Sequence, residues 1–185
     1  MEPALKPASQ QTRSQHVGIL ATQVTFQGAL YASLLERFAQ NVTIHQSTCP
    51  GLVTQIEKGN LDDPETRRIL EDAIKPMLMA GIDTIVLGCT HYPFVIPLIK
   101  EIAGHRVKVI DPSPAIALQI KRVLKDKGLI NTDIQNGSIS IFTSASPTTL
   151  QSLLPILIGD TMTVQSLFWD IDTHGVSILS RRAKL

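Results

Sequence analysis

Short apolar runs alternate with amphipathic segments over most of this chain, and this alternation is the strongest constraint on its fold. Residues 17–22 form a run rich in branched side chains, and residues 30–38 follow with apolar positions three and four apart, which predicts a strand and then a helix. Residues 83–88 form a mostly continuous apolar run in which polar and apolar side chains do not alternate. This pattern predicts a parallel strand that is covered on both faces of the sheet. The pattern therefore predicts an α/β fold made of βα units, with a parallel sheet and right-handed connections.

Local signals define one helix at both ends. Asp63 can cap its amino end, Pro64 suits the first helical position, and Gly81 is placed to end it. Pro76 lies inside this helix and predicts a bend. The type of the apolar segment 52–56 stays undecided. Further strands are predicted at residues 42–45, 107–110 and 138–142, and further helices at residues 93–102, 115–124 and 148–157.

Composition excludes several classes of protein. With 43% hydrophobic and 18% charged residues in a chain of 185, the protein should be globular. The net charge of +1 and the aromatic content of 4% argue against a nucleic-acid partner. The polar opening segment and the lack of a run of eighteen apolar residues predict no signal peptide and no membrane partner, and hence a cytoplasmic location. Two cysteines are too few for a disulfide framework and fit a reducing compartment.

Cys89 is the main candidate for chemistry. It directly follows a predicted strand and precedes a predicted helix, and ligands of parallel α/β sheets bind beyond the carboxyl ends of the strands. The amino end of the helix and nearby amides could stabilise the thiolate of a group that ordinarily titrates near pH ~8.5, and His91 could relay the proton. A lone free cysteine is more often a small buried hydrophobe, but Thr90, His91 and Tyr92 beside Cys89 favour a functional thiol.

Other kinds of site have less support in the sequence. Cys89 and His91 lie too close in sequence, without a further cluster of ligands, to match the usual spacing of a zinc site. A cysteine hydrolase would also use a thiol and an imidazole, but it needs an oxyanion site for which the sequence shows no specific signal. The sequence contains neither GxGxxG nor a Walker A motif. We therefore expect neither a metal nor a nucleotide cofactor.

The segment around Cys89 resembles a known family. Residues 87–93 read Leu-Gly-Cys-Thr-His-Tyr-Pro, which is similar to the most specific motif of glutamate racemases in the aspartate/glutamate racemase family. Other segments that are similar to family elements are residues 2–8, residues 17–22 with Thr25, residues 49–53 with Glu57, and, more loosely, residues 110–113 and 143–147. The resemblance thus covers most of the chain.

The resemblance implies an activity and roles for individual residues. The family interconverts L- and D-glutamate without a cofactor, with two cysteines on opposite faces of the α-carbon, and this supplies D-glutamate for peptidoglycan. By resemblance, Cys89 is the thiol that faces the α-proton of L-glutamate, His91 assists it, and Glu57 is a helper carboxylate. The residues implied to hold the substrate are Thr22, Thr25, Thr90 and His91. Without the family, Glu57 would be read as an exposed carboxylate at a helix end, and Cys49 is read as structural.

The resemblance also implies a domain plan in which one domain is incomplete. Residues 1–12 would be a remnant of the first domain or a linker, residues 13–113 the second α/β domain, and residues 114–185 a return segment that packs with the first domain. The family's Asp-Ser-Gly segment and the Cys-Asn-Thr segment that holds its first thiol have no match here. We therefore expect exposed apolar surface and impaired activity of this chain alone.

Alternatives for the function, the partner and the substrate stay open at this point. The chain could be a non-catalytic module that binds an amino acid or another protein, or it could be one half of a split racemase whose partner is a separate N-terminal half chain. A homodimer is the other partner considered. Aspartate remains an alternative substrate, because one side-chain methylene is a small difference to discriminate.

Overall fold

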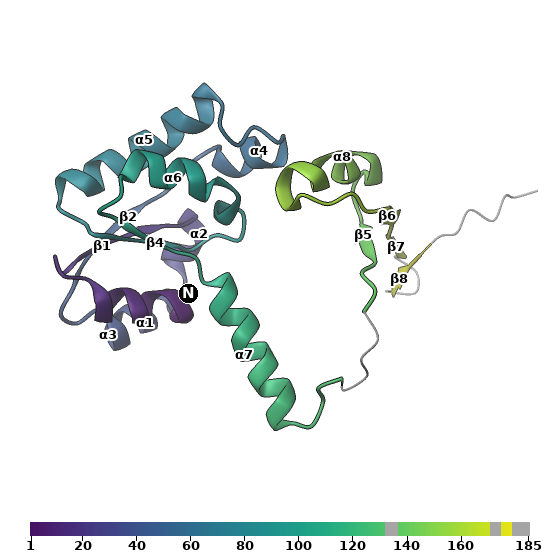
Figure 1. The fold of residues 1–185 in the computed structure, drawn as a ribbon, viewed down its shortest axis with the longest axis horizontal. Helices are drawn as coiled ribbons and strands as arrows, with labels where there is room; N and C mark the ends of the chain where they lie inside the picture. The colour runs from purple at the N-terminus through teal and green to yellow at the C-terminus, as the bar shows by residue number, and fades with distance from the viewer. Residues whose placement is uncertain (132–136, 171–174, 179–185) are drawn as a thin grey trace, which may run out of the picture. The chain divides into compact units, whose positions relative to one another are not determined.

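The computed structural model describes residues 1–131, 137–170 and 175–178, and the chain divides into two compact units (Figure 1). Unit 1 comprises Met1–Asn131 and unit 2 comprises Thr132–Leu185. Unit 1 contains all the residues that the sequence analysis proposed for the site. None of the helices in the described ranges is both long and apolar enough to span a bilayer.

Unit 1 is built on a parallel four-stranded sheet, which confirms the predicted α/β fold. In spatial order its strands are β2 (Thr43–Ser47), β1 (His16–Leu20), β3 (Thr84–Leu87) and β4 (Lys108–Ile110). The chain passes from β1 outward to β2 and then returns to the other side of β1 to form β3. The order therefore reverses between β1 and β3, and the carboxyl ends of these two strands form the topological switch point of the sheet.

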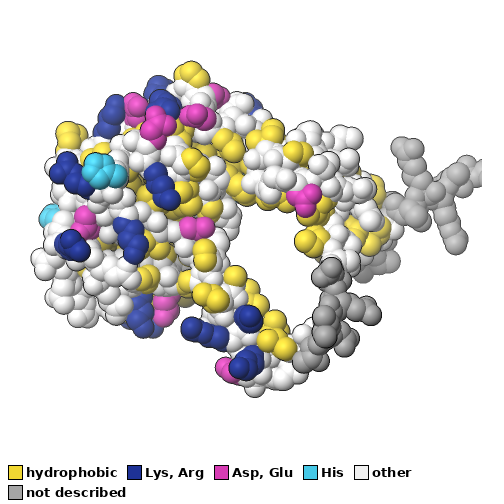
Figure 2. Space-filling model, viewed as in Figure 1, with side chains coloured by type: hydrophobic (Ala, Val, Ile, Leu, Met, Phe, Trp, Pro, Cys, Tyr) yellow, Lys and Arg dark blue, Asp and Glu magenta, His cyan; other side chains and the backbone are white. Residues whose placement is uncertain are grey.

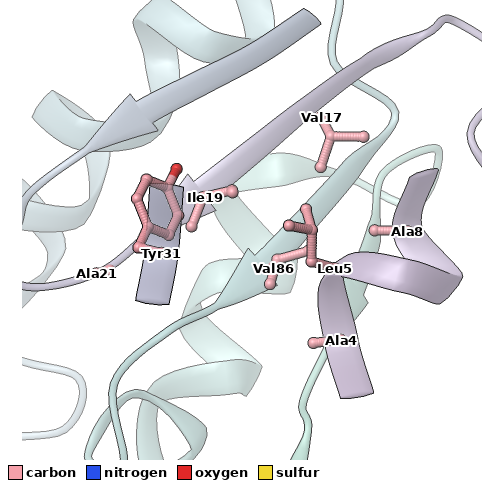
Figure 3. Close-up of a cluster of buried hydrophobic side chains, with 8 residues drawn as sticks. All are labelled: Ala4, Leu5, Ala8, Val17, Ile19, Ala21, Tyr31 and Val86. Atoms are coloured by element: carbon pink, nitrogen blue, oxygen red, sulfur yellow. The ribbon is translucent and has the colours of Figure 1, made fainter. Parts of the chain in front are cut away.

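One face of the sheet is covered by α1 (Glu2–Gln11) and α3 (Ala29–Phe38) (Figure 1). Figure 3 shows Leu5 of α1 packed beside Val86 of β3 in a cluster of buried side chains. The sequence pattern does not predict α1, since this segment is polar and contains two prolines. Pro3 is tolerated in the first turn, where the missing amide has no partner to lose. The other members of this cluster are Ala4, Ala8, Val17, Ile19, Ala21 and Tyr31.

The opposite face of the sheet is covered by α5 (Pro64–Met79) and α6 (Ile96–Ala103) (Figure 1). The predicted start of α5 is confirmed, because the Oδ1 atom of Asp63 accepts a hydrogen bond of 2.7 Å from the amide of Thr66. Its predicted end is also confirmed, because Gly81 follows with a φ of 82°, which favours glycine. The undecided segment 52–56 is helical and belongs to α4 (Leu52–Glu57).

The helix predicted to open at Pro93 was wrong in its first turn. The structure has a 3-10 turn, η1 (Tyr92–Val95), before α6 begins at Ile96. Pro97 explains the break, because it has no amide to donate to the carbonyl of residue 93 in a continuous α-helix. The loop after β3 therefore leads into a tight turn, and the dipole of α6 begins several residues beyond Cys89.

The last helix of unit 1 and the described parts of unit 2 carry many exposed apolar side chains. Helix α7 (Ser113–Asp126) has no buried residue, and hydrophobic side chains are visible along it in Figure 2. In unit 2, α8 (Pro147–Ile158) contributes the buried Leu154. Unit 1 also contains a short helix, α2 (Gln23–Gln27). In the described part of unit 2, β5 (Ile141–Thr143) and β6 (Val164–Ser166) pair in parallel. The strands β7 (Phe168–Asp170) and β8 (Gly175–Ser177) pair antiparallel.

Candidate functional site

Cys89 lies at the switch point of the sheet. In the register of the two central strands Leu20 pairs with Leu87, and the amide of Gly88 donates a hydrogen bond of 2.8 Å to the carbonyl of Leu20. Thr22 and Cys89 each come two residues after these paired positions. The structure therefore brings the loops that carry both residues to the same edge of the sheet, where doubly wound proteins bind ligands.

Gly88 allows the two loops to approach each other this closely. A Cβ atom at Gly88 would lie 2.8 Å from Cβ of Ala21 and 2.6 Å from Sδ of Met1. The Met1 side chain is flexible and can move away, but the Cβ of Ala21 is fixed to the backbone, so the backbone of one of the two loops would have to move. Glycine is thus required at this position by the packing between β1 and β3.

We expect Gly88→Ala to destabilise the chain by about 1–3 kcal/mol, because the added methyl group overpacks this contact. Denaturant unfolding followed by circular dichroism would measure the change. Gly137→Ala is the matched control, since a Cβ atom there meets no atom within 4 Å. Equal stability of the two variants would show that the β1 and β3 loops are not packed as described.

A pocket of about 150 Å³ opens beside Cys89. The loop after β3 contributes Cys89 and Thr90, and the start of α7 contributes Ser113. The Oδ1 atom of Asp111 fixes this start, because it accepts hydrogen bonds from the amide of Ser113 at 2.8 Å and from its hydroxyl at 2.7 Å. The other residues that line the pocket are Met1, Leu87, Gly88, Pro93, Pro112 and Ile116.

The structure brings His91 and Glu57 together, although they lie on different elements. The Nε2 atom of His91 is 3.4 Å from Oε1 of Glu57, and the two side chains are 35% and 62% exposed. Water screens a pair with this exposure, so its contribution to stability is small. The contact places the Glu57 carboxylate beside the imidazole of His91, which lies in the loop that carries Cys89. Neither residue lines the pocket beside Cys89.

Thr22 and Thr25 form the turn that follows β1. The hydroxyl of Thr22 caps α2 by accepting a hydrogen bond of 3.4 Å from the amide of Thr25, and the two hydroxyl oxygens are 3.0 Å apart. Both side chains are partly exposed. They lie at the switch point but not in the lining of the pocket beside Cys89. Their geometry is that of a capped turn, with a hydroxyl pair available at the ligand-binding edge.

The second cysteine is buried and remains a neutral thiol. Cys49 is 5% exposed, and its pKa is raised to about 12, mainly by burial; a hydrogen bond with Tyr92 lowers the pKa, and the nearby Cys89 adds a smaller rise. Tyr92 is itself buried, and burial raises its pKa as well. Tyr92 therefore packs beneath the loop with Cys49, whereas the sequence analysis grouped it with the polar residues beside Cys89.

Among the described residues, the structure contains no group of three or more His, Cys, Asp and Glu side chains that could hold a metal ion. What the switch point offers is a partly exposed thiol at Cys89, an imidazole with its carboxylate nearby, and hydroxyl groups of threonines. Such a set can accept a proton from a bound substrate and hold polar groups of that substrate.

Known proteins match both the sequence and the fold. Residues 1–120 match the family model described as Asp/Glu/Hydantoin racemase. Glutamate racemase of Pseudomonas aeruginosa is 46% identical over 167 residues, which are 90% of this chain and 63% of that protein. The crystal structure of glutamate racemase isoform RacE1 from Bacillus anthracis has a TM-score of 0.79 at 26% identity, and the match covers 90% of this chain and 62% of that one.

A further match is the Escherichia coli glutamate racemase, whose structure is a complex with L-glutamate and the activator UDP-MurNAc-Ala. It has a TM-score of 0.70 at 26% identity, and the match covers 87% of this chain and 60% of that one. The chain therefore spans less than two thirds of the length of these relatives.

Proposed function

Because this chain belongs to the Asp/Glu/hydantoin racemase family, we propose that it interconverts L- and D-glutamate by thiol acid/base chemistry that needs no cofactor. The observation that carries this proposal is the position of Cys89 at the switch point between β1 and β3. Glutamate is favoured over aspartate because the relatives at 42–46% identity are glutamate racemases. The product D-glutamate would serve the synthesis of peptidoglycan.

In the proposed reaction Cys89 acts as the base for one face of the substrate. Its thiolate takes the α-proton of L-glutamate, so that an S–H bond forms while the Cα–H bond breaks and the electron pair moves toward the substrate carboxylate. Inversion then requires an acid on the opposite face of the α-carbon. Cys49 does not suit that role, because it is buried and its pKa is raised to about 12.

We assign supporting roles to the residues around this thiol. His91 assists proton transfer at Cys89, and its 3.4 Å contact with Glu57 supports an orienting role for that carboxylate. Thr90 is supported as a substrate-binding residue by its position in the pocket beside Cys89. Thr22 and Thr25 would bind the amino or carboxylate groups of the substrate from the neighbouring strand.

The 185-residue chain on its own is proposed to be impaired, since the residues near Cys89 supply a base for one face only. The acid for the opposite face would come with a separate N-terminal half chain, and a homodimer is the other partner proposed. Exposed apolar side chains support such a partner: Leu118 and Ile120 of α7 are 59% and 55% exposed. In the proposed domain plan, residues 1–12 are a remnant of the first domain or a linker, residues 13–113 form the second α/β domain, and residues 114–185 pack with the incomplete first domain. The free state of Cys49 and Cys89 supports a cytoplasmic location.

The proposal is tested by incubating the chain with L-glutamate in deuterated water. NMR would follow loss of the α-proton, and chiral chromatography would detect D-glutamate. Exchange without inversion is the result expected for a one-sided base. Exchange together with inversion would show a working racemase and contradict the expected impairment. Neither signal, combined with thermal stabilisation by D-glutamate, would favour the non-catalytic amino-acid-binding module. L-aspartate in a parallel sample tests the choice of substrate.

We expect His91→Asn to slow α-proton exchange by about 10²-fold, the lower end of the range for a group that assists proton transfer. Asparagine keeps a polar side chain but cannot relay a proton. His105→Asn is the control, because His105 is an exposed histidine that follows α6. An exchange rate that is the same in both variants would remove His91 from the mechanism.

A further inference from the structure

A second pocket lies at the opposite end of the sheet from Cys89, where the strands begin. Its volume is about 850 Å³, within the usual range for small-molecule sites. It is formed by the end of α1 and the segment after it, by the start of β3, and by the segment that enters β4. The residues that line it are Gln11, Arg13, Ser14, Asp83, Thr84, Arg106 and Lys108.

The single carboxylate in this pocket is already occupied by neutral donors. The Oδ1 atom of Asp83 accepts hydrogen bonds from the hydroxyls of Thr12 at 2.7 Å and Thr84 at 2.9 Å. Its Oδ2 atom accepts from the amides of Arg13 at 2.6 Å and Ser14 at 2.9 Å. Burial opposes ionisation, but these hydrogen bonds outweigh it and lower the pKa of Asp83 to about 2. Asp83 thus anchors the loop before β1 and has little capacity left to pair with a cation.

In the part of the chain that the structure describes, the three cations that line the pocket have no carboxylate partner. Within residues 1–131, 137–170 and 175–178, no ion pair involves Arg13, Arg106 or Lys108. Lys108 donates from Nζ to the neutral Oε1 atom of Gln11. Arg67 and Arg68 differ, because each forms ion pairs with two carboxylates on the same unit. Three positive charges against one carboxylate leave this pocket with a net charge of +2.

We propose that this pocket binds a multiply charged oxyanion of the phosphate class, such as a diphosphate or a phosphate ester. Arginine presents a planar fork of donors that fits oxyanions through paired hydrogen bonds, and a net charge of +2 matches an anion with two or more charges. This pocket is separate from the proposed glutamate site beside Cys89, because the five residues of extended chain from Thr84 to Cys89 span about 16 Å. The site stands independently of the proposed function.

The experiment uses the full 185-residue chain and inorganic pyrophosphate. At constant ionic strength, the amide NMR signals of Arg13, Ser14, Thr84 and Lys108 should shift and saturate with one binding event. In the double variant Arg106→Gln with Lys108→Gln, the affinity should fall about tenfold or more, since two charge-assisted hydrogen bonds are lost. The control is Lys121→Gln with Lys125→Gln, which removes the same charge from the exposed face of α7.

Equal affinities in the two double variants, or shifts that grow linearly without saturation, would overturn the proposal. If the first double variant does not give a folded spectrum, Arg13→Gln provides the same comparison with one charge removed. None of these measurements uses α-proton exchange. A failed racemase assay would therefore leave this result unchanged, and the reverse also holds.

Discussion

Replacing Cys89 with alanine is expected to slow the exchange of the α-proton of L-glutamate by about 10²–10⁴-fold, which is the range for loss of a positioned acid or base. The variant removes a single sulfur atom at a partly exposed site after β3. It leaves in place the close packing between Gly88 and Ala21 that holds the loop. The fold should therefore persist while the proton acceptor is lost. NMR in deuterated water measures the rate for both proteins.

The chain provides its own control for this variant. Cys49→Ala removes the other thiol, which is buried and has a pKa raised to about 12. This change should cost roughly 1 kcal/mol of stability, as a typical substitution does, and leave exchange nearly unaffected. A result in which Cys49→Ala abolishes exchange, or in which Cys89→Ala keeps it, would mean that the base has been assigned to the wrong cysteine.

The second large effect is on stability, and it concerns the first helix. Leu5 of α1 is fully buried in the cluster that Figure 3 shows, beside Val86 of β3. Leu5→Ala removes buried methyl groups and leaves a cavity, so we expect a loss of about 2–5 kcal/mol in the free energy of unfolding. Urea unfolding followed by circular dichroism measures it. A loss of this size is a large fraction of the stability of a small domain.

Gln10→Ala is the matched control on the same helix. Gln10 is exposed, and surface substitutions usually change stability by less than about 0.5 kcal/mol. If Leu5→Ala cost no more than Gln10→Ala, α1 would not form part of the core of unit 1. That outcome would also affect the site, because Met1 at the start of α1 lines the pocket beside Cys89.

Much of the fold could be predicted because the signals are local. Branched runs gave β1 and β3, which are buried strands of the parallel sheet. The capping pattern of Asp63 with Pro64 and Gly81 gave both ends of α5. These features are determined by residues that are close in sequence and by burial, so they can be predicted from the local pattern of residues.

Other parts of the fold depend on contacts that a local pattern does not show. Helix α1 is polar on average and contains Pro7, yet Ala4, Leu5 and Ala8 are buried against the sheet. Packing against the sheet outweighs the low propensity of this segment. The 3-10 turn before α6 depends on Pro97, four residues after the expected start at Pro93.

Candidate residues for the site could be proposed from the sequence, but their arrangement in space could not. Cys89 could be placed at the end of a strand, but the strand order that makes this end a switch point requires the tertiary structure. The contact between His91 and Glu57 joins the β3 loop to the end of α4, which no local pattern indicates. The cationic pocket at the opposite end of the sheet gave no motif, because its residues come from three separate segments. The assigned roles of these residues stay predictions.

The central claim is that glutamate binds at the switch point beside Cys89. The most direct test is the rate at which iodoacetamide alkylates each cysteine, measured by mass spectrometry of peptides at increasing concentrations of glutamate. We predict that Cys89 reacts in the free chain, that glutamate slows this reaction in a saturable way, and that the buried Cys49 stays largely unmodified throughout. Alkylation of Cys89 at an unchanged rate in saturating glutamate would contradict the claim.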